Sequence, residues 1–485
     1  MNRPGSHTHA NDGPDDSTLH EGVPTTSDPA RESTPFKPRS PIERLFSTYT
    51  HFCHPLLTSI GDNLIDSIIG PMPTQQFLDN FLPISCIPSY SRPRPFWKGC
   101  FQTTLDATDE LKMYDPFVSE CINCCAQYLS FPYKIESISP FAPQLHFVNS
   151  HSLGDKDNRY PFETKPDISV YHKSLSDKAP ENCESSLIDI HIEFKRYTWD
   201  DPFGIPTTTT RRDSAFIAPT PNKTNTLGQI GAYATSQLTS QFRTHCYSVY
   251  VNRDHARIIR WERDGAIVTE SIFYNIDSAL TRFFSRYAQA PCELHGINTM
   301  VSPTCDDKVA KLARSKLALP DETAMFETTV PRTADGLPFM VIFACPSIYS
   351  TTPFGRATCT CPAYDPKGKH LVFLKDSWRL DGDDIIPEGH FYAKLAANHV
   401  PHIPQCLASG DMKYLPQQKT QMQKYSQCCW ACQKGLAITP HIHYRLVLDL
   451  VGEALTTFAS SKELVQVIHN ALLGELYPSI WWYVI

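Results

Sequence analysis

No stretch of the 485-residue sequence is apolar over the length of about 20 residues that a membrane-spanning helix requires. The N-terminus also lacks the apolar core of a secretory signal. The 17 cysteines show no spacing typical of a disulfide framework, so we expect free thiols. These absences predict an intracellular protein, cytoplasmic or nuclear and not secreted, without a membrane partner.

The sequence has little excess charge of either sign. Its formal net charge of −7 at pH 7 argues against a broad basic surface for nucleic acid or acidic lipid. Hydrophobic residues make up 41% of the chain and aromatic residues 11%, which is typical of a globular protein. A chain of 485 residues is long enough for two or three domains.

Composition and hydrophobic pattern divide the chain into five parts. Residues 1–41 are polar and poor in aromatic side chains, which predicts a disordered tail because such a segment buries too little surface to offset its ordering entropy. Residues 42–290 are predicted to hold N-terminal helices and an α/β domain, and residues 346–473 a second domain. We treat residues 291–345 as a junction and residues 474–485 as an atypical apolar tail. The expected fold class is α+β.

Hydrophobic periodicity locates the elements of the first domain. Spacings of three and four predict helices, whereas alternation predicts strands. A helical pattern runs from Ile42 and is broken at Gly70–Pro73. The further expected elements are helices over 75–82, 109–128 and from 226, strands over 165–171, 187–195, 245–251, 256–261 and from 266, and a loop over 198–224.

Three residues of the second domain occur in an order that suits phosphate binding. Gly355 precedes a predicted strand over 371–378 that carries Lys375, and Glu388 opens the next predicted helix. A glycine lets backbone amides approach a phosphate, a strand lysine can hold phosphates, and a helix glutamate can fix that lysine. A lysine at the end of a strand and a glutamate at the start of a helix are common, so the spacing alone favours an ordinary structural role, and one glycine falls far short of a G-x-G-x-x-G loop.

A second group of polar residues lies in the first domain. Asp167 comes at the start of one predicted strand, and Glu193 and Lys195 lie on the next. Two carboxylates at adjacent strand ends can hold magnesium, and a lysine beside them can stabilise an attacking hydroxide. With Gln229 and Tyr233 on the following helix, the pattern is similar to that of PD-(D/E)xK nucleases. The alternative is that Glu193 and Lys195 form a solvated pair and Asp167 caps its strand.

The chain as a whole resembles the fungal-type protein kinase family. The resemblance covers about residues 42–473 and follows the family's order. The GRxT and KDSW elements, at Gly355–Thr358 and Lys375–Trp378, are fairly specific. The other segments that carry it are Gly70–Pro73 with Phe77–Asp79, Lys165–Asp167, Glu193–Lys195, Gln229–Tyr233, Ala256–Trp261 with Arg263–Ile267, and Arg445–Leu448 with Gly452 and Leu455.

This resemblance implies the N-lobe of a serine/threonine kinase, a small antiparallel sheet with one helix, and ATP as its ligand with Mg²⁺ as a further cofactor. Lys375 would hold the phosphates, Glu388 would pair with it, and Gly355 would lie in the phosphate loop. Leu448–Val451 would form the hinge that touches adenine. The implied cofactor-binding residues are therefore Gly355, Lys375, Glu388, Asp449 and Val451.

The sequence departs from the family where phosphoryl transfer would be catalysed. It holds neither a His-Arg-Asp nor an Asp-Phe-Gly motif, and the catalytic loop is replaced by the apolar run Tyr477–Ile485. We therefore expect a truncated, pseudokinase-like protein without kinase catalytic residues that binds ATP. The alternatives are a magnesium-dependent nuclease that uses Asp167, Glu193, Lys195 and Gln229, with nucleic acid as its partner, and a non-enzymatic interaction module.

A weak zinc pattern lies near the C-terminus. Cys429 and Cys432 form a C-x-x-C pair, and His441 and His443 follow within a short distance along the chain. Cysteine and histidine in groups of four suit tetrahedral zinc. No metal is assigned to these residues, because free thiols and buried histidines explain the same pattern.

Overall fold

The computed structural model contains two β-sheets with helices packed against them, and all its described residues lie within residues 41–485. Among them, no helix has both the length and the apolar character needed to cross a membrane. The predicted tail over residues 1–41 and residues 476–485 lie outside the described part. The structure describes residues 50–91, 98–123, 142, 144–154, 164–174, 183–204, 216–218, 220–332, 336–346, 352–412, 415–431, 438–453 and 457–475.

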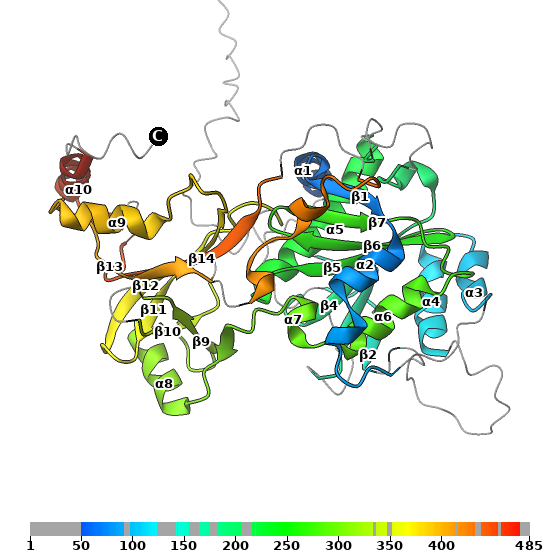
Figure 1. Cartoon of the computed structure of the whole chain (residues 1–485), viewed down its shortest axis with the longest axis horizontal. Helices are drawn as coiled ribbons and strands as arrows, with labels where there is room; N and C mark the ends of the chain where they lie inside the picture. Colours follow the sequence, from blue (N-terminus) through cyan, green and yellow to red (C-terminus); the bar gives the residue numbers. More distant parts are fainter. Residues whose placement is uncertain are drawn as a thin grey trace, which may run out of the picture. The chain divides into compact units, whose positions relative to one another are not determined.

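The first part of the chain builds a seven-stranded mixed sheet in the order β1-β7-β6-β5-β4-β3-β2 (Figure 1). β1 pairs with β7 and β4 pairs with β5 in parallel, and the other neighbours are antiparallel. The strands are β1 (Ile68–Met72), β2 (Leu145–Asn149), β3 (Ile168–His172), β4 (Ile188–Lys195), β5 (Cys246–Asn252), β6 (His255–Glu262) and β7 (Gly265–Thr269).

Helices pack on both faces of this sheet because its central strands alternate in polarity. Ile190, Ile192 and Phe194 of β4 join an apolar core with α2, α4 and α6. The polar residues between them point to the other face, where His191 contacts Tyr233 of α5 with ring centroids 5.4 Å apart. The helices of this part are α1 (Thr50–Ile65), α2 (Thr74–Phe81), α3 (Gln102–Asp106), α4 (Leu111–Asn123), α5 (Pro221–Ser240), α6 (Ala279–Gln289) and α7 (Cys292–His295), with 3₁₀ turns at Ile84–Cys86 and Thr198–Asp200.

The second part builds an antiparallel seven-stranded sheet in the order β13-β14-β12-β11-β10-β9-β8. Figure 1 shows α8 and α9 at this sheet. Its strands are β8 (Val301–Pro303), β9 (Met325–Val330), β10 (Phe339–Ala344), β11 (Cys359–Asp365), β12 (His370–Leu380), β13 (Cys406–Asp411) and β14 (His441–Leu448). The helices are α8 (Asp307–Lys316), α9 (Glu388–Ala397) and α10 (Ser461–Glu475), with 3₁₀ turns at Pro416–Gln418 and Met422–Tyr425.

Neighbouring residues of β12 face opposite sides of the second sheet. Val372 and Leu374 belong to an apolar core that Phe242, from the end of α5, packs against. Leu371 and Phe373 pack on the other side, in the clusters that contain residues of α8 and α9. Alternation along the strand therefore sends Lys375 toward the α9 side and Asp376 toward the first sheet.

The predicted α+β class is confirmed, and most expected elements are present within a few residues. Two differences have clear physical reasons. The stretch expected to be a junction, residues 291–345, contains β8, β9 and β10; β8 and β9 are short and partly exposed, so their alternation is weak. Residues 68–72 form a strand rather than the end of a helix, because they pair with β7 almost 200 residues away.

Candidate functional site

Lys375 and Glu388 form a close ion pair on the second sheet. The Lys375 Nζ donates to both carboxylate oxygens of Glu388, at 2.8 and 2.7 Å. β12 is hydrogen-bonded on both sides, to β11 and β14, which fixes the position of the lysine. Glu388 begins α9, and the Tyr444 hydroxyl accepts a hydrogen bond from the amide of Gly389 at 2.7 Å. The ion pair predicted from the sequence is therefore present.

A cavity of about 450 Å³ lies at this ion pair. Its volume falls in the range of about 300–1,000 Å³ that is typical of small-molecule sites. Besides Lys375 and Glu388, it is lined by the cations Arg356 and Arg379 and by apolar side chains that include Ile385 and Phe391. Arg379 is already paired with Asp411 and Lys375 with Glu388, so Arg356 supplies the remaining positive charge of the lining, which suits an anionic ligand with an apolar part.

The other residues predicted to bind the cofactor lie at two places. Gly355 lies in the turn between β10 and β11 with φ of +88°, a backbone conformation that favours glycine. Asp449 directly follows β14, and its carboxylate accepts a hydrogen bond from the Gln405 amide at 2.8 Å. Val451 lies two residues further on and is half-buried. Asp449 thus joins the end of β14 to the start of β13.

The acidic group of the first sheet is also brought together. Asp167 Oδ2 accepts a hydrogen bond from the Phe194 amide at 2.8 Å, which places it beside β4. The Lys195 Nζ lies 2.5 Å from Glu193 Oε1 and 3.7 Å from Glu110 Oε1. Both members of the Glu193–Lys195 pair are largely buried, with side chains 3% and 14% exposed, so the solvated surface pair considered from the sequence is wrong. The second Glu193 oxygen is buried and has no hydrogen-bond partner among the described residues.

Burial and the neighbouring charges shift the pKa values of the ionisable side chains around Asp167 and Lys195. Burial raises the pKa of Asp167 well above its usual range, and the negative charge of Glu193 adds to this effect. Burial also raises the pKa of Glu110. Burial alone would lower the pKa of Lys195, but the carboxylates of Glu193, Asp167 and Glu110 outweigh it and raise that pKa. The three neighbouring carboxyl groups therefore keep Lys195 in its protonated, positively charged form.

Two residues predicted from the Q-x-x-x-Y pattern lie on α5, and one neighbour was missed. Gln229 Oε1 is buried, and no described residue forms a hydrogen bond with it. The Tyr233 hydroxyl donates to the Lys165 carbonyl at 2.9 Å, two residues before Asp167. Glu110 was not selected from the sequence, because an acidic residue at the start of a helix is usually explained by the helix dipole.

The zinc candidates do not assemble in the described part of the chain. His443 Nδ1 lies 2.6 Å from Gln418 Oε1 and its Nε2 lies 2.6 Å from Asp376 Oδ1, so both ring nitrogens are engaged. Cys429 is exposed, and Cys432 lies outside the described residues. Across the described ranges, no group of three or more His, Cys, Asp or Glu side chains is arranged to hold a metal ion.

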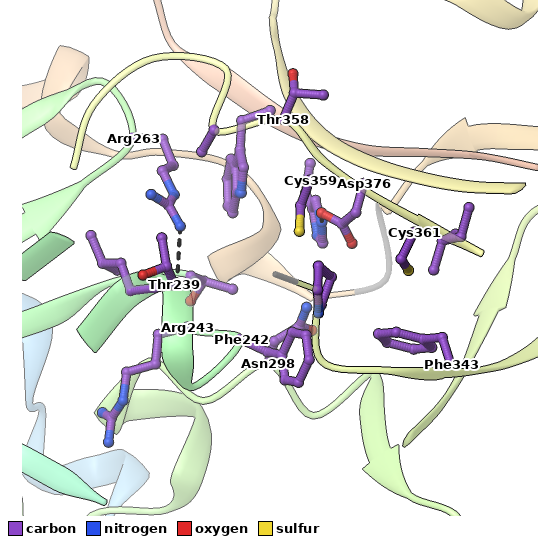
Figure 2. Close-up of a pocket in the computed structure, with 17 residues that line it drawn as sticks. Thr239, Phe242, Arg243, Arg263, Asn298, Phe343, Thr358, Cys359, Cys361 and Asp376 are labelled. Atoms are coloured by element: carbon purple, nitrogen blue, oxygen red, sulfur yellow. Dashed lines mark hydrogen bonds and ion pairs between the residues drawn. The ribbon is translucent and has the colours of Figure 1, made fainter. Parts of the chain in front are cut away.

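A second cavity, of about 70 Å³, lies between the two sheets. Figure 2 shows Arg263 from the first sheet and Cys359 and Asp376 from the second around it. Asp376 Oδ2 accepts from Arg445 Nε at 2.7 Å, and its other oxygen contacts His443. Burial alone would raise the pKa of Asp376, but His443 and Arg445 hold it well below its usual range. This cavity is too small for a nucleotide. The Asp376 carboxylate that lines it is already bound by His443 and Arg445.

Comparisons with known proteins find no counterpart: neither a family model, nor a curated protein, nor a solved structure matches the chain. The site therefore has to be interpreted from its own geometry.

Proposed function

We propose that the second sheet binds a nucleoside triphosphate, with ATP as the expected ligand, at the cavity beside Lys375 and Glu388. The observation that carries this proposal is the bidentate Lys375–Glu388 pair at a cavity of about 450 Å³ with a positive lining. A lysine held in this way presents a fixed cation to phosphate oxygens, and the glutamate prevents it from being drawn away.

The order of the strands supports the proposal. Counting from β10, the chain forms strands β10 and β11 with Gly355 between them in sequence, the lysine strand β12, helix α9, and strands β13 and β14, with β14 next to β12 in the sheet. A protein-kinase N-lobe has the same sequence of parts. We thus propose a homologue of the fungal-type protein kinases that binds ATP. The proposed role is the binding of ATP at the Lys375–Glu388 pair.

Lys375→Met should abolish stabilisation by ATP. Wild-type protein is expected to unfold at a higher temperature when ATP and Mg²⁺ are added, by an amount equivalent to about 2.7 kcal/mol at a hundredfold excess of ATP over its Kd. The variant should show no shift, because the phosphates lose their central cation. Thermal unfolding monitored by fluorescence measures both proteins. Lys367→Ala removes an exposed cation from the β11–β12 turn of the same sheet and is the matched control. Equal shifts in wild type and Lys375→Met, or no shift in wild type, would contradict the proposal.

A magnesium-dependent nuclease is the second candidate. The observation that favours it is the buried Glu193 oxygen without a partner, in a group that also contains Asp167 and Lys195. Mg²⁺ binds commonly through one or two carboxylates and keeps several waters, so Asp167 and Glu193 would fit as its protein ligands. The order of elements is α4, three antiparallel strands β2–β4, α5 and the parallel strand β5, with Glu193 on β4 and Asp167 directly before the neighbouring strand β3.

The nuclease candidate predicts that Asp167→Ala abolishes magnesium-dependent cleavage of DNA, because one of the two metal ligands is lost. Lys375→Met should leave that cleavage unchanged, since it lies on the other sheet. Gel analysis of a linear DNA substrate with Mg²⁺, and with EDTA in place of Mg²⁺, measures the activity. Cleavage that persists in Asp167→Ala, or no cleavage by wild type, would remove this candidate.

A further inference from the structure

The three cations at the 450 Å³ cavity differ in how strongly they are already bound. Lys375 is paired with both oxygens of Glu388. Arg379 donates to both oxygens of Asp411, at 2.7 and 2.8 Å. Arg356 lies 3.9 Å from Glu388 Oε2, and its side chain is 61% exposed. Arg356 therefore has the guanidinium most available for an incoming ligand.

The backbone amide that a glycine turn would offer to a phosphate is already used. The Gly355 amide donates to the Arg263 carbonyl, which belongs to the turn between β6 and β7, at 2.7 Å. A phosphate at this amide would have to displace that hydrogen bond. The glycine turn of this chain thus differs from a loop whose free amides surround the phosphates.

The same contacts hold Arg356 at the cavity. The Trp378 amide of β12 donates to the Arg356 carbonyl at 2.7 Å. The Arg263 Nη1 donates to the Pro353 carbonyl at 3.1 Å, and the Phe354 ring stacks on Trp261 with centroids 5.9 Å apart. The turn is therefore fixed from both sides while the Arg356 side chain extends over Glu388.

We propose that Arg356, rather than the amide of Gly355, binds the terminal phosphates of the nucleotide, and that the β6–β7 turn of the first sheet positions it. This inference rests on the proposed nucleotide site. Arginine forms a planar fork of donors that matches phosphate oxygens, and two such bonds are stronger than one amide contact. Lys375 and Arg356 would then both distinguish a triphosphate from an unphosphorylated nucleoside, with Arg356 holding the terminal phosphates.

Calorimetric titration of the full chain with ATP and with adenosine tests this inference. Arg356→Ala should weaken ATP binding by about 10- to 100-fold, as expected for the loss of charged hydrogen bonds, and should leave adenosine binding unchanged. Arg356→Lys should recover part of the ATP affinity, because the charge remains while the fork is lost. Lys367→Ala, an exposed cation away from the cavity, should bind both ligands as wild type does.

The outcomes separate this inference from the proposed function. If Arg356→Ala binds ATP like wild type while Lys375→Met does not, the role of Arg356 is overturned and the nucleotide site stands. If Arg356→Ala lost affinity for ATP and for adenosine to the same extent, the role of Arg356 would also be overturned, since the residue would then act by maintaining the fold of the turn. If wild type binds no ATP, the nucleotide site and the role of Arg356 both fail.

Discussion

Asp376→Ala should lower the free energy of unfolding by about 3–5 kcal/mol, because it leaves a buried cation without its counter-charge. The Arg445 side chain is fully buried, and Asp376 is the carboxylate that pairs with it. Arg445 Nη1 also donates to the Thr328 hydroxyl on β9, so the loss would be felt on three strands. Calorimetry should show a fall in the unfolding temperature of roughly 3–5 °C for a cooperative unit of this size.

The stabilisation by Asp376 should depend on pH in a defined direction. Its pKa is held well below the usual range in the folded protein by His443 and Arg445. The stabilisation is therefore fully present above the unfolded-state value of about 4 and disappears as the pH falls further. The difference in stability between wild type and Asp376→Ala should be large at neutral pH and small in strong acid. A difference below about 1 kcal/mol at neutral pH would show that the network contributes little.

Trp261→Ala should lower the free energy of unfolding by about 3–5 kcal/mol, because removal of the buried indole leaves a cavity beside the first sheet. Trp261 is fully buried, and its Nε1 donates to the Ser248 hydroxyl at 2.7 Å. The substitution removes the ring that Phe354 stacks on as well as the core contacts. Urea unfolding monitored by circular dichroism measures the change.

Trp199→Ala is the matched control for this substitution. Trp199 is 57% exposed and stacks on Tyr197 with centroids 4.3 Å apart, so its loss should cost at most about 1 kcal/mol. If both tryptophan variants were equally stable, the packing described around Trp261 would not exist in solution.

Local sequence pattern was sufficient for elements that are long and strongly periodic. The alternation through Leu187–Lys195 predicts β4 within one residue, and the run 75–82 predicts α2. β1 could not be recognised, since Ile68 and Ile69 continue a helical spacing and become a strand only by pairing with β7. α5 begins five residues before its expected start, where Pro221 occupies the first turn.

At the candidate sites too, contacts between residues close in sequence were predicted, whereas contacts between residues far apart in sequence were not. The Lys375–Glu388 ion pair joins residues only 13 positions apart, and it was expected from the family resemblance of the segments that contain them. The partners of Asp376 lie 67 and 69 residues away and were not predicted. The contact of Arg263 with the Gly355 turn joins two sheets, and no periodicity along the chain encodes it.

Direct titration with ATP tests the central claim, that the Lys375–Glu388 cavity is a nucleotide site. Calorimetry on the full chain with Mg²⁺ present should show saturable binding of ATP at a single site. That binding should be lost in Lys375→Met and weakened in Glu388→Gln, which keeps the shape of the side chain but removes the charge that holds the lysine. Absence of binding to wild type, or unchanged binding to Lys375→Met, would contradict the account.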